Sequence, residues 1–123
     1  MACIMVVDDE IDVRLTLREA LELHGYSVIE ASNGNAALSL YRKEQPDLLI
    51  LDLFMPEKEG LEVILELKRE YPDAKIIAIS GGGTLGLKEG ALRAAQYFGA
   101  QRGFTKPFAL RDVLDAVEAL LKT

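Results

Sequence analysis

Carboxylates stand at the ends of two apolar segments of this sequence. The run Asp8-Asp9-Glu10 directly follows Cys3–Val7, and Asp52 directly follows the apolar residues 48–51. Burying a carboxylate is costly unless a cation or hydrogen-bond donors use its charge. Carboxylates that lie close together also repel one another, so acids gathered in one place need a cation. If the two segments are neighbours in space, the pattern predicts a site for a metal ion and an anion.

Two further polar residues follow later apolar segments. Ser80 ends the segment 74–79, and Lys106 ends the segment 101–105. A carboxylate such as Asp52 can act as a nucleophile on phosphorus, forming an aspartyl phosphate. A lysine would supply positive charge to the transferred phosphoryl group, and a serine hydroxyl would hydrogen-bond with one of its oxygens. We therefore interpret Asp52 as the candidate phosphorylation site, with Ser80 and Lys106 as its catalytic companions.

Hard oxygen ligands of this kind suit Mg²⁺, which usually keeps several waters and takes one or two carboxylates plus a phosphate oxygen. Each residue alone has a simpler explanation. An acidic run after a strand often caps a helix, and a serine before glycines is usually part of a turn. The combination at successive segment ends favours a site.

Strand-like and helix-like patterns alternate along the whole chain. Short apolar runs predict strands, and leucines at helical spacing between charged residues predict helices. The predicted strands cover residues 3–7, 26–31, 48–52, 74–79 and 101–105. The predicted helices cover residues 11–24, 33–43, 87–98 and 110–122, with another from Gly60 to the stop at Tyr71-Pro72.

This alternation predicts an α/β fold with an open, doubly wound parallel sheet covered by helices on both faces. Right-handed crossovers favour the flavodoxin-like strand order 2-1-3-4-5. In such sheets ligands bind at the carboxyl ends of the strands, where the order reverses between strands one and three. Asp8, Asp9 and Asp52 are expected at that point. No linker or repeat interrupts the pattern, so we predict one domain over residues 1–123.

Composition narrows the classes of function. The net charge of −6 argues against direct binding of nucleic acid, because no basic face would neutralise phosphates. No apolar stretch reaches the length of a membrane span, and the N-terminus lacks a signal segment. The lone Cys3 is expected to be a reduced core thiol. We expect a cytoplasmic protein that does not contact a membrane.

The motifs of the candidate site resemble those of a known family, the receiver domains of bacterial two-component response regulators. The matching motifs are VVDDE at 6–10, LDLFMP at 51–56 with Gly60, ISG at 79–81 and FTKPF at 104–108. The resemblance spans essentially the whole chain, and the combination of motifs is highly specific.

The resemblance implies a metal site and a phosphoryl donor. Asp9, Asp52 and the backbone carbonyl of Phe54 would bind Mg²⁺ directly, and Asp8 would act through a bound water. Asp52 would accept a phosphoryl group from a phosphohistidine on a sensor histidine kinase or a histidine phosphotransfer protein. Ser80 would help to hold that group.

The resemblance also implies that Lys106 holds the phosphoryl group and that the Lys106-Pro107 peptide bond is cis. The signal would leave by docking to a downstream protein. We expect a phosphorylation-dependent switch rather than an enzyme that turns over substrate.

Some positions depart from the family pattern. Receivers usually carry an aromatic switch residue three positions before the lysine, where this chain has Gly103. The neighbouring Phe104 would point to the opposite face and join the core. The segment from Ser80 to Lys106 is longer than the pattern, and Gly82-Gly83 predicts an extended or flexible approach to the fourth helix. Phe54 could shield the phosphoryl group from water.

Two other classes of protein share parts of this pattern. A haloacid dehalogenase-type phosphatase needs a second aspartate two residues after the nucleophile, where this chain has Phe54. A flavodoxin-like cofactor binder needs a phosphate-binding loop after the first strand, where the acids would repel phosphate.

Overall fold

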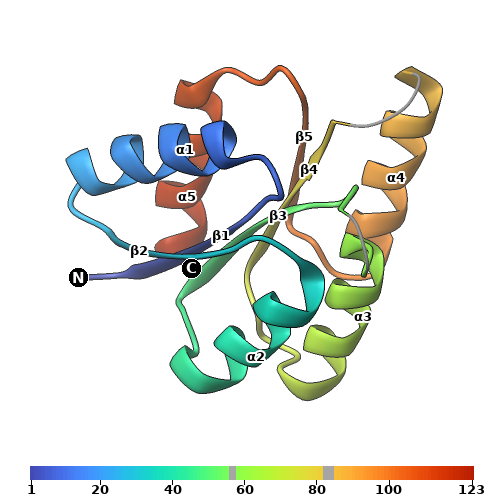
Figure 1. Ribbon diagram of the computed structural model, residues 1–123, viewed down its shortest axis with the longest axis horizontal. Helices are drawn as coiled ribbons and strands as arrows, with labels where there is room; N and C mark the ends of the chain where they lie inside the picture. The colour runs from blue at the N-terminus through green and yellow to red at the C-terminus, as the bar shows by residue number, and fades with distance from the viewer. Residues whose placement is uncertain (56–57, 82–84) are drawn as a thin grey trace.

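The structure is a computed structural model that describes residues 1–55, 58–81 and 85–123, with only the backbone described for residues 85–88. Its centre is a parallel sheet with the strand order β2-β1-β3-β4-β5 (Figure 1). The strands are β1 (Cys3–Val7), β2 (Ser27–Ala31), β3 (Leu48–Asp52), β4 (Ile76–Ser80) and β5 (Arg102–Thr105). The predicted fold class and strand order are therefore confirmed.

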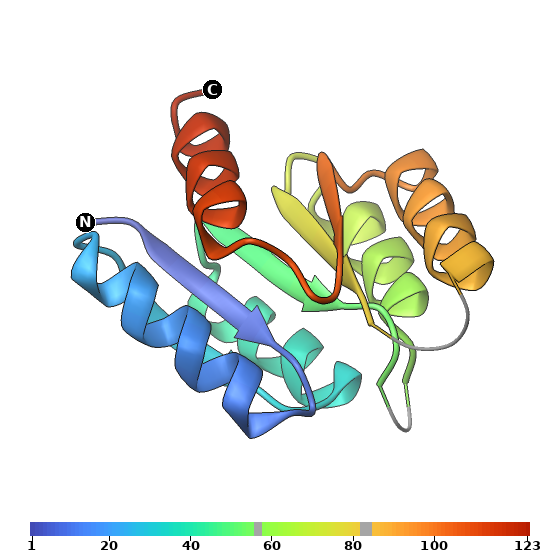
Figure 2. The same cartoon turned by 90° about the horizontal axis from the view of Figure 1, so that it is seen from above.

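Helices connect the strands and cover both faces of the sheet (Figures 1 and 2). They are α1 (Ile11–Leu23), α2 (Gly34–Glu44), α3 (Gly60–Glu70), α4 (Leu85–Tyr97) and α5 (Leu110–Leu121). The side chains of α1 and α5 pack on one face of the sheet, and those of α2, α3 and α4 pack on the other. The two faces form separate apolar layers because successive residues of a strand point to opposite sides.

The central strands β3 and β4 are buried at every position. This burial explains why they read as continuous apolar runs rather than alternating patterns. Within the sheet, Val7 pairs with Leu51, Asp52 pairs with Ile79, and Ser80 pairs with Thr105. The register therefore brings the residues at the carboxyl ends of β1, β3, β4 and β5 to one edge.

The structure differs from the predicted elements mainly at their ends. The fourth helix begins at Leu85, two residues before the predicted start at Leu87. The expectation of an extended approach through Gly82-Gly83 falls outside the described residues.

Gly103 lies on β5 beneath α4. A Cβ atom added at Gly103 would lie 3.0 Å from the Cδ2 atom of Leu92 on α4. Because Leu92 fills the space beside the strand, an aromatic side chain would not fit there in this conformation. Phe104 packs against the core on the other face, as predicted.

Candidate functional site

Lys106 stands at the centre of the predicted site. Its Nζ atom lies 2.9 Å from Asp8 Oδ2, 3.0 Å from Glu10 Oε1 and 3.5 Å from Asp52 Oδ2. Asp8 and Glu10 follow β1, Asp52 ends β3 and Lys106 follows β5. Residues almost a hundred positions apart in the sequence therefore meet at the switch point of the sheet, as the topology predicts.

Backbone donors orient the two buried carboxylates. The amide of Glu10 donates to Asp8 Oδ1 at 2.9 Å, and the amide of Phe54 donates to Asp52 Oδ1 at 3.1 Å. In each case the aspartate side chain accepts the backbone amide two residues later in the chain, and this local hydrogen bond fixes the carboxylate within a turn. The second oxygen of each aspartate then lies towards Lys106.

The site holds more negative charge than Lys106 can balance. Burial, followed by the neighbouring charge of Asp8, raises the pKa of Asp52 to about 7, although the Phe54 amide and Lys106 oppose this rise. Burial likewise raises the pKa of Asp8. Burial alone would lower the pKa of Lys106, but its contacts with Asp8 and Glu10 raise it above the ordinary lysine range. The chemistry of the site therefore favours a further cation.

Ser80 supplies a hydroxyl at the same edge of the sheet. Its side chain is completely buried, and Ser80 Oγ forms no hydrogen bond with any residue that the structure describes. Buried hydroxyls are nearly always hydrogen-bonded, so an exception calls for a specific explanation. Because Ser80 lies between the ends of β3 and β5, an oxygen of a bound phosphoryl group is a suitable partner.

A cluster of carboxylates could hold the cation. One oxygen from each of Asp8, Asp9 and Glu10 lies within 4.8 Å of the others. Carboxylate oxygens are the ligands that Mg²⁺ prefers, so this donor set fits the ion that the family resemblance implied. Asp52 lies outside this group in the described structure, although it shares Lys106 with Asp8 and Glu10. The predicted ligand set that includes Asp52 and the Phe54 carbonyl stays a prediction.

Glu10 is the site residue that sequence reasoning did not assign. The sequence signal was its place directly after Asp8-Asp9, but an exposed acid there is also typical of a helix start. The contact of Glu10 with Lys106, ninety-six positions further along the chain, identifies it as a residue of the site and not only of the helix start.

A glycine makes room for the lysine. A Cβ atom added at Gly81 would collide with Cδ of Lys106, so the lysine stem runs directly over the Gly81 backbone. The Lys106-Pro107 peptide bond is cis, as the family resemblance implied.

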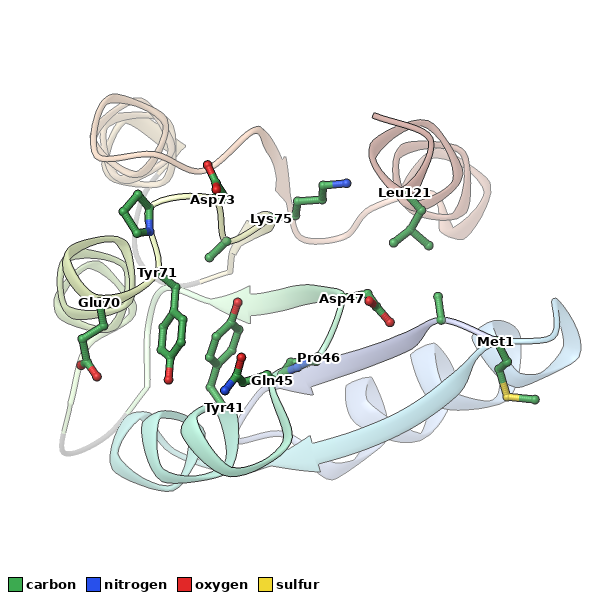
Figure 3. A pocket seen from close by; sticks show the side chains of 13 residues that line it. Met1, Tyr41, Gln45, Pro46, Asp47, Glu70, Tyr71, Asp73, Lys75 and Leu121 are labelled. Carbon is green, nitrogen blue, oxygen red and sulfur yellow. The ribbon is translucent and has the colours of Figure 1, made fainter.

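A cavity of about 760 Å³ lies at the opposite, amino end of the strands (Figure 3). The rings of Tyr41 and Tyr71 line it, with their centroids 5.1 Å apart. Two of its charged side chains already bind other parts of the protein. Asp47 accepts a hydrogen bond from the Cys3 amide, and Lys75 donates to carbonyls at the end of α5. The acidic edge of the sheet, not this cavity, gathers the groups able to do chemistry.

Comparison with known proteins defines the class of this fold and site. The family model described as the response regulator receiver domain matches residues 4–118. The chain belongs to this family, whose members are phosphoacceptor switches in two-component signalling and take phosphoryl groups from histidine kinases. The expected resemblance is therefore confirmed.

Individual relatives support the same assignment. The chain is 32% identical to sporulation initiation phosphotransferase F of Bacillus subtilis, over 96% of this chain and 92% of that protein. It is 38% identical to the response regulator MprA of Mycolicibacterium vanbaalenii, over 97% of this chain but only 50% of that protein. The chain thus spans nearly all of one relative and half of the other.

Solved structures agree in fold. The receiver domain of NtrX from Brucella abortus superposes with a TM-score of 0.89 at 29% identity, and the match covers 98% of both chains. A CheY-like receiver domain protein from Methanospirillum hungatei superposes with a TM-score of 0.89 at 25% identity, covering 99% of this chain and 94% of that one. Among the described residues, no helix has the length and apolar character needed to cross a membrane.

Proposed function

We propose that Asp52 accepts a phosphoryl group from a phosphohistidine in a Mg²⁺-dependent reaction, and that this changes how residues 1–123, as one receiver domain, dock to a downstream protein. The observation that carries the proposal is the meeting of a buried Asp52 with Asp8 and Lys106 at one edge of the sheet. The buried Ser80 hydroxyl at the same edge, which has no hydrogen-bond partner among the described residues, adds a donor for the product.

In the proposed transfer, an oxygen of the Asp52 carboxylate forms a bond to phosphorus as the phosphorus–nitrogen bond of the phosphohistidine breaks. The electron pair of the broken bond stays on the imidazole nitrogen, and the histidine leaves as a neutral ring when its other nitrogen carries a proton. The Phe54 amide holds Asp52 Oδ1, so the carboxylate keeps a fixed orientation towards the incoming group.

Lys106 and Ser80 provide the chain's own contacts with the phosphoryl group. In the structure Lys106 lies 2.9 Å from Asp8 and 3.5 Å from Asp52, so it reaches both sides of the site. Lysine acts as a compact point charge that can turn towards new acceptors. Ser80 would donate its hydroxyl proton to a phosphoryl oxygen, which gives this buried group a partner.

Asp8, Asp9, Asp52 and the Phe54 carbonyl would hold Mg²⁺. When bound, the ion would supply positive charge that offsets the repulsion between the carboxylates and an incoming phosphoryl group. The raised pKa of Asp52 supports this role, because a cation nearby favours the ionised carboxylate that must attack.

The proposed partners are a sensor histidine kinase or a histidine phosphotransfer protein, and an unidentified downstream protein. The similarity to a relative named as a phosphotransferase supports a role in passing phosphoryl groups between proteins. We propose no turnover of phosphate esters, since Phe54 stands where a phosphatase of this chemistry needs an acid. Direct contact with nucleic acid or membranes is not part of the proposal, and a cytoplasmic location stays a prediction.

The proposal is tested by incubating the protein with acetyl phosphate and Mg²⁺ and measuring its intact mass. We expect the wild-type protein to gain one phosphate, and we expect no gain in Asp52→Asn or in the presence of a chelator. Asp47→Asn is a matched control, because Asp47 precedes the same strand at its other end and hydrogen-bonds with Cys3. Equal phosphorylation of Asp52→Asn and wild type would overturn the assignment.

A further inference from the structure

We infer that Arg14 on α1 is a positioning residue for the acidic cluster and so contributes to the affinity for the divalent cation. The inference rests on the proposed function, because the cation is the Mg²⁺ proposed for that site. Arg14 touches no reacting atom and would act through the backbone of Asp8.

The guanidinium of Arg14 bridges the ends of two strands. Its Nη1 atom donates to the backbone carbonyl of Asp8 at 2.7 Å, and its Nε atom donates to Glu30 Oε1 at 3.0 Å. Glu30 lies on β2, where it pairs with Val6 of β1. The Arg14 side chain is only 15% exposed, so both contacts are largely shielded from water. One side chain therefore connects the acidic turn after β1 with the end of β2.

The Asp8 carbonyl lies within the turn that presents the acids. The amide of Asp8 donates to Ala31 at 3.2 Å, and Asp8 Oδ1 accepts the amide of Glu10 at 2.9 Å. The amide of Arg14 donates to the Glu10 carbonyl at 3.2 Å, so Arg14 holds this turn with both its backbone and its side chain. A shift of the Asp8 carbonyl would rotate the peptide that leads into Asp9.

Arginine suits this position because its planar fork can bond two acceptors that lie in different directions. Its charge also partly offsets the negative charge of Asp8, Asp9 and Glu10 without occupying the place of a metal ion. Hydrogen bonds from Arg18 and then Arg14 lower the pKa of Glu30, which keeps that carboxylate ionised as a partner.

Arg18 offers a matched control on the same helix. Its Nη1 atom lies 2.5 Å from Glu30 Oε2, so Arg14 and Arg18 share one carboxylate. No hydrogen bond links Arg18 to Asp8 in the described part of the chain. Removing Arg18 therefore disturbs the same ion-pair network but leaves the Asp8 carbonyl bonded to Arg14.

The test compares Arg14→Gln, Arg14→Lys and Arg18→Gln with wild type by calorimetric titration with MgCl₂ and by amide hydrogen exchange. Changing a residue that orients a metal ligand typically weakens metal binding by about tenfold or more, and we expect that loss in Arg14→Gln. We expect Arg18→Gln to bind Mg²⁺ as wild type does. Arg14→Lys keeps the charge but loses the fork, so it should also bind more weakly than wild type.

Amide exchange in the metal-free protein gives a second readout that does not depend on the ion. The amide of Glu10 should exchange faster in Arg14→Gln than in wild type or Arg18→Gln, because its acceptor Asp8 is no longer fixed. If Arg14→Gln fails to fold, Arg14→Lys decides both measurements.

The inference would be overturned if the Arg14 variants bound Mg²⁺ as tightly as wild type and exchanged the Glu10 amide at the wild-type rate. Equal losses in Arg14→Gln and Arg18→Gln would also overturn it, since the effect would then come from the Glu30 network as a whole. If wild type itself binds no Mg²⁺, the proposed metal site fails and the affinity part of the inference fails with it. The exchange of Glu10 would still show whether Arg14 fixes the turn.

Discussion

Asp52 combines burial with nearby negative charge, as its proposed role of phosphoacceptor requires. Asp52 is only 2% exposed, yet its carboxylate lies beside the negative charge of Asp8. In the metal-free protein, Lys106 shares its single positive charge among three carboxylates. A phosphoacceptor that uses a metal ion needs this excess of negative charge, because a carboxylate already neutralised by fixed cations would not attract the ion. The excess of buried negative charge lowers the free energy of unfolding of the metal-free protein.

The first prediction concerns this cost. The folded protein raises the pKa of Asp52 from 3.8 to about 7, so the folded state holds a proton that the unfolded state releases between these values. Stability of the metal-free protein should therefore fall as the pH rises from about 4 to about 7 and then stay level. Each pKa unit corresponds to about 1.4 kcal/mol, so Asp52→Asn should raise the free energy of unfolding by about 2–4 kcal/mol at pH 8.

Urea denaturation at pH 8 and pH 4 without Mg²⁺ measures this effect. The stabilisation should be much smaller at the lower pH, because pH 4 lies close to the unfolded-state pKa of 3.8 and the wild-type carboxyl is partly protonated there in the unfolded state as well. An Asp52→Asn variant that is less stable than wild type at pH 8 would contradict the electrostatic account of the site.

A second prediction concerns Phe54, two residues after the proposed acceptor Asp52. Its ring is half-buried against the core, and its amide donates to Asp52. We expect the ring to limit the access of water to the phosphoryl group, so Phe54→Asn should shorten the lifetime of the phosphorylated protein several-fold. The decay of phosphoprotein after removal of the donor measures this, and an unchanged lifetime removes the idea.

At this scale the sequence predicted which side chains would meet at the site, because each follows an apolar strand. Asp8, Asp52 and Lys106 meet as expected. The parts played by Glu10 and Arg14 could not be predicted, because their bonds join residues on different elements. An exposed glutamate and a helical arginine can have many roles in a protein, and only the folded structure shows which contacts they make.

At the scale of elements, close backbone packing places the end of β3, which carries Asp52, against α3. A Cβ atom added at Gly60, the first residue of α3, would lie 2.6 Å from Leu53 Cα and 2.7 Å from the Asp52 carbonyl. The Gly60 amide also donates to the Leu53 carbonyl at 3.0 Å. The helix therefore begins directly on the segment that carries Asp52, and only glycine allows this approach.

Gly60→Ala should lower the free energy of unfolding by about 1–3 kcal/mol, the usual cost of forcing extra volume into a packed site. It should also slow phosphorylation by acetyl phosphate, because relief of the clash moves the Asp52 backbone. Gly90→Ala on α4 is the control, since the nearest atom to its added Cβ is 4.0 Å away. That variant should gain about 0.5–1 kcal/mol from helix propensity. A Gly60→Ala protein as stable as Gly90→Ala would contradict the close packing.

The elements themselves were predicted well where their pattern is strong. The strand β3 and the start of α1 fall where the apolar runs and helical spacing place them. The helix α4 begins at Leu85 rather than at the predicted Leu87. The sequence misplaced this start because a glycine-rich segment carries little periodic signal. The sequence could not predict which side chain fills the space beside Gly103, because that residue, Leu92, comes from another element.

At the scale of the whole molecule, the chain carries a net charge of −6, and one edge of its sheet gathers a cluster of three carboxylates beside Lys106. A ligand that binds only the folded state stabilises it by about 2.7 kcal/mol when its concentration is one hundred times its Kd. Saturating Mg²⁺ should therefore raise the Tm of wild type. The rise should be larger at pH 8 than at pH 6, because protonation of Asp52, with a pKa of about 7, competes with the cation.

Thermal unfolding with and without Mg²⁺ at the two pH values checks this expectation. Asp52→Asn should show a smaller rise at pH 8 than wild type does. A rise in Tm that is the same in both proteins would mean that Mg²⁺ binds elsewhere.

The most direct test of the central claim is to locate the phosphoryl group on the chain. Borohydride reduces an acyl phosphate to an alcohol, so phosphorylated aspartate becomes homoserine and can be identified by tandem mass spectrometry. After incubation with acetyl phosphate and Mg²⁺, we expect homoserine at position 52 alone, and none when the metal is chelated. Homoserine at position 8 or 9, or a phosphate that survives on another residue type, would contradict the account.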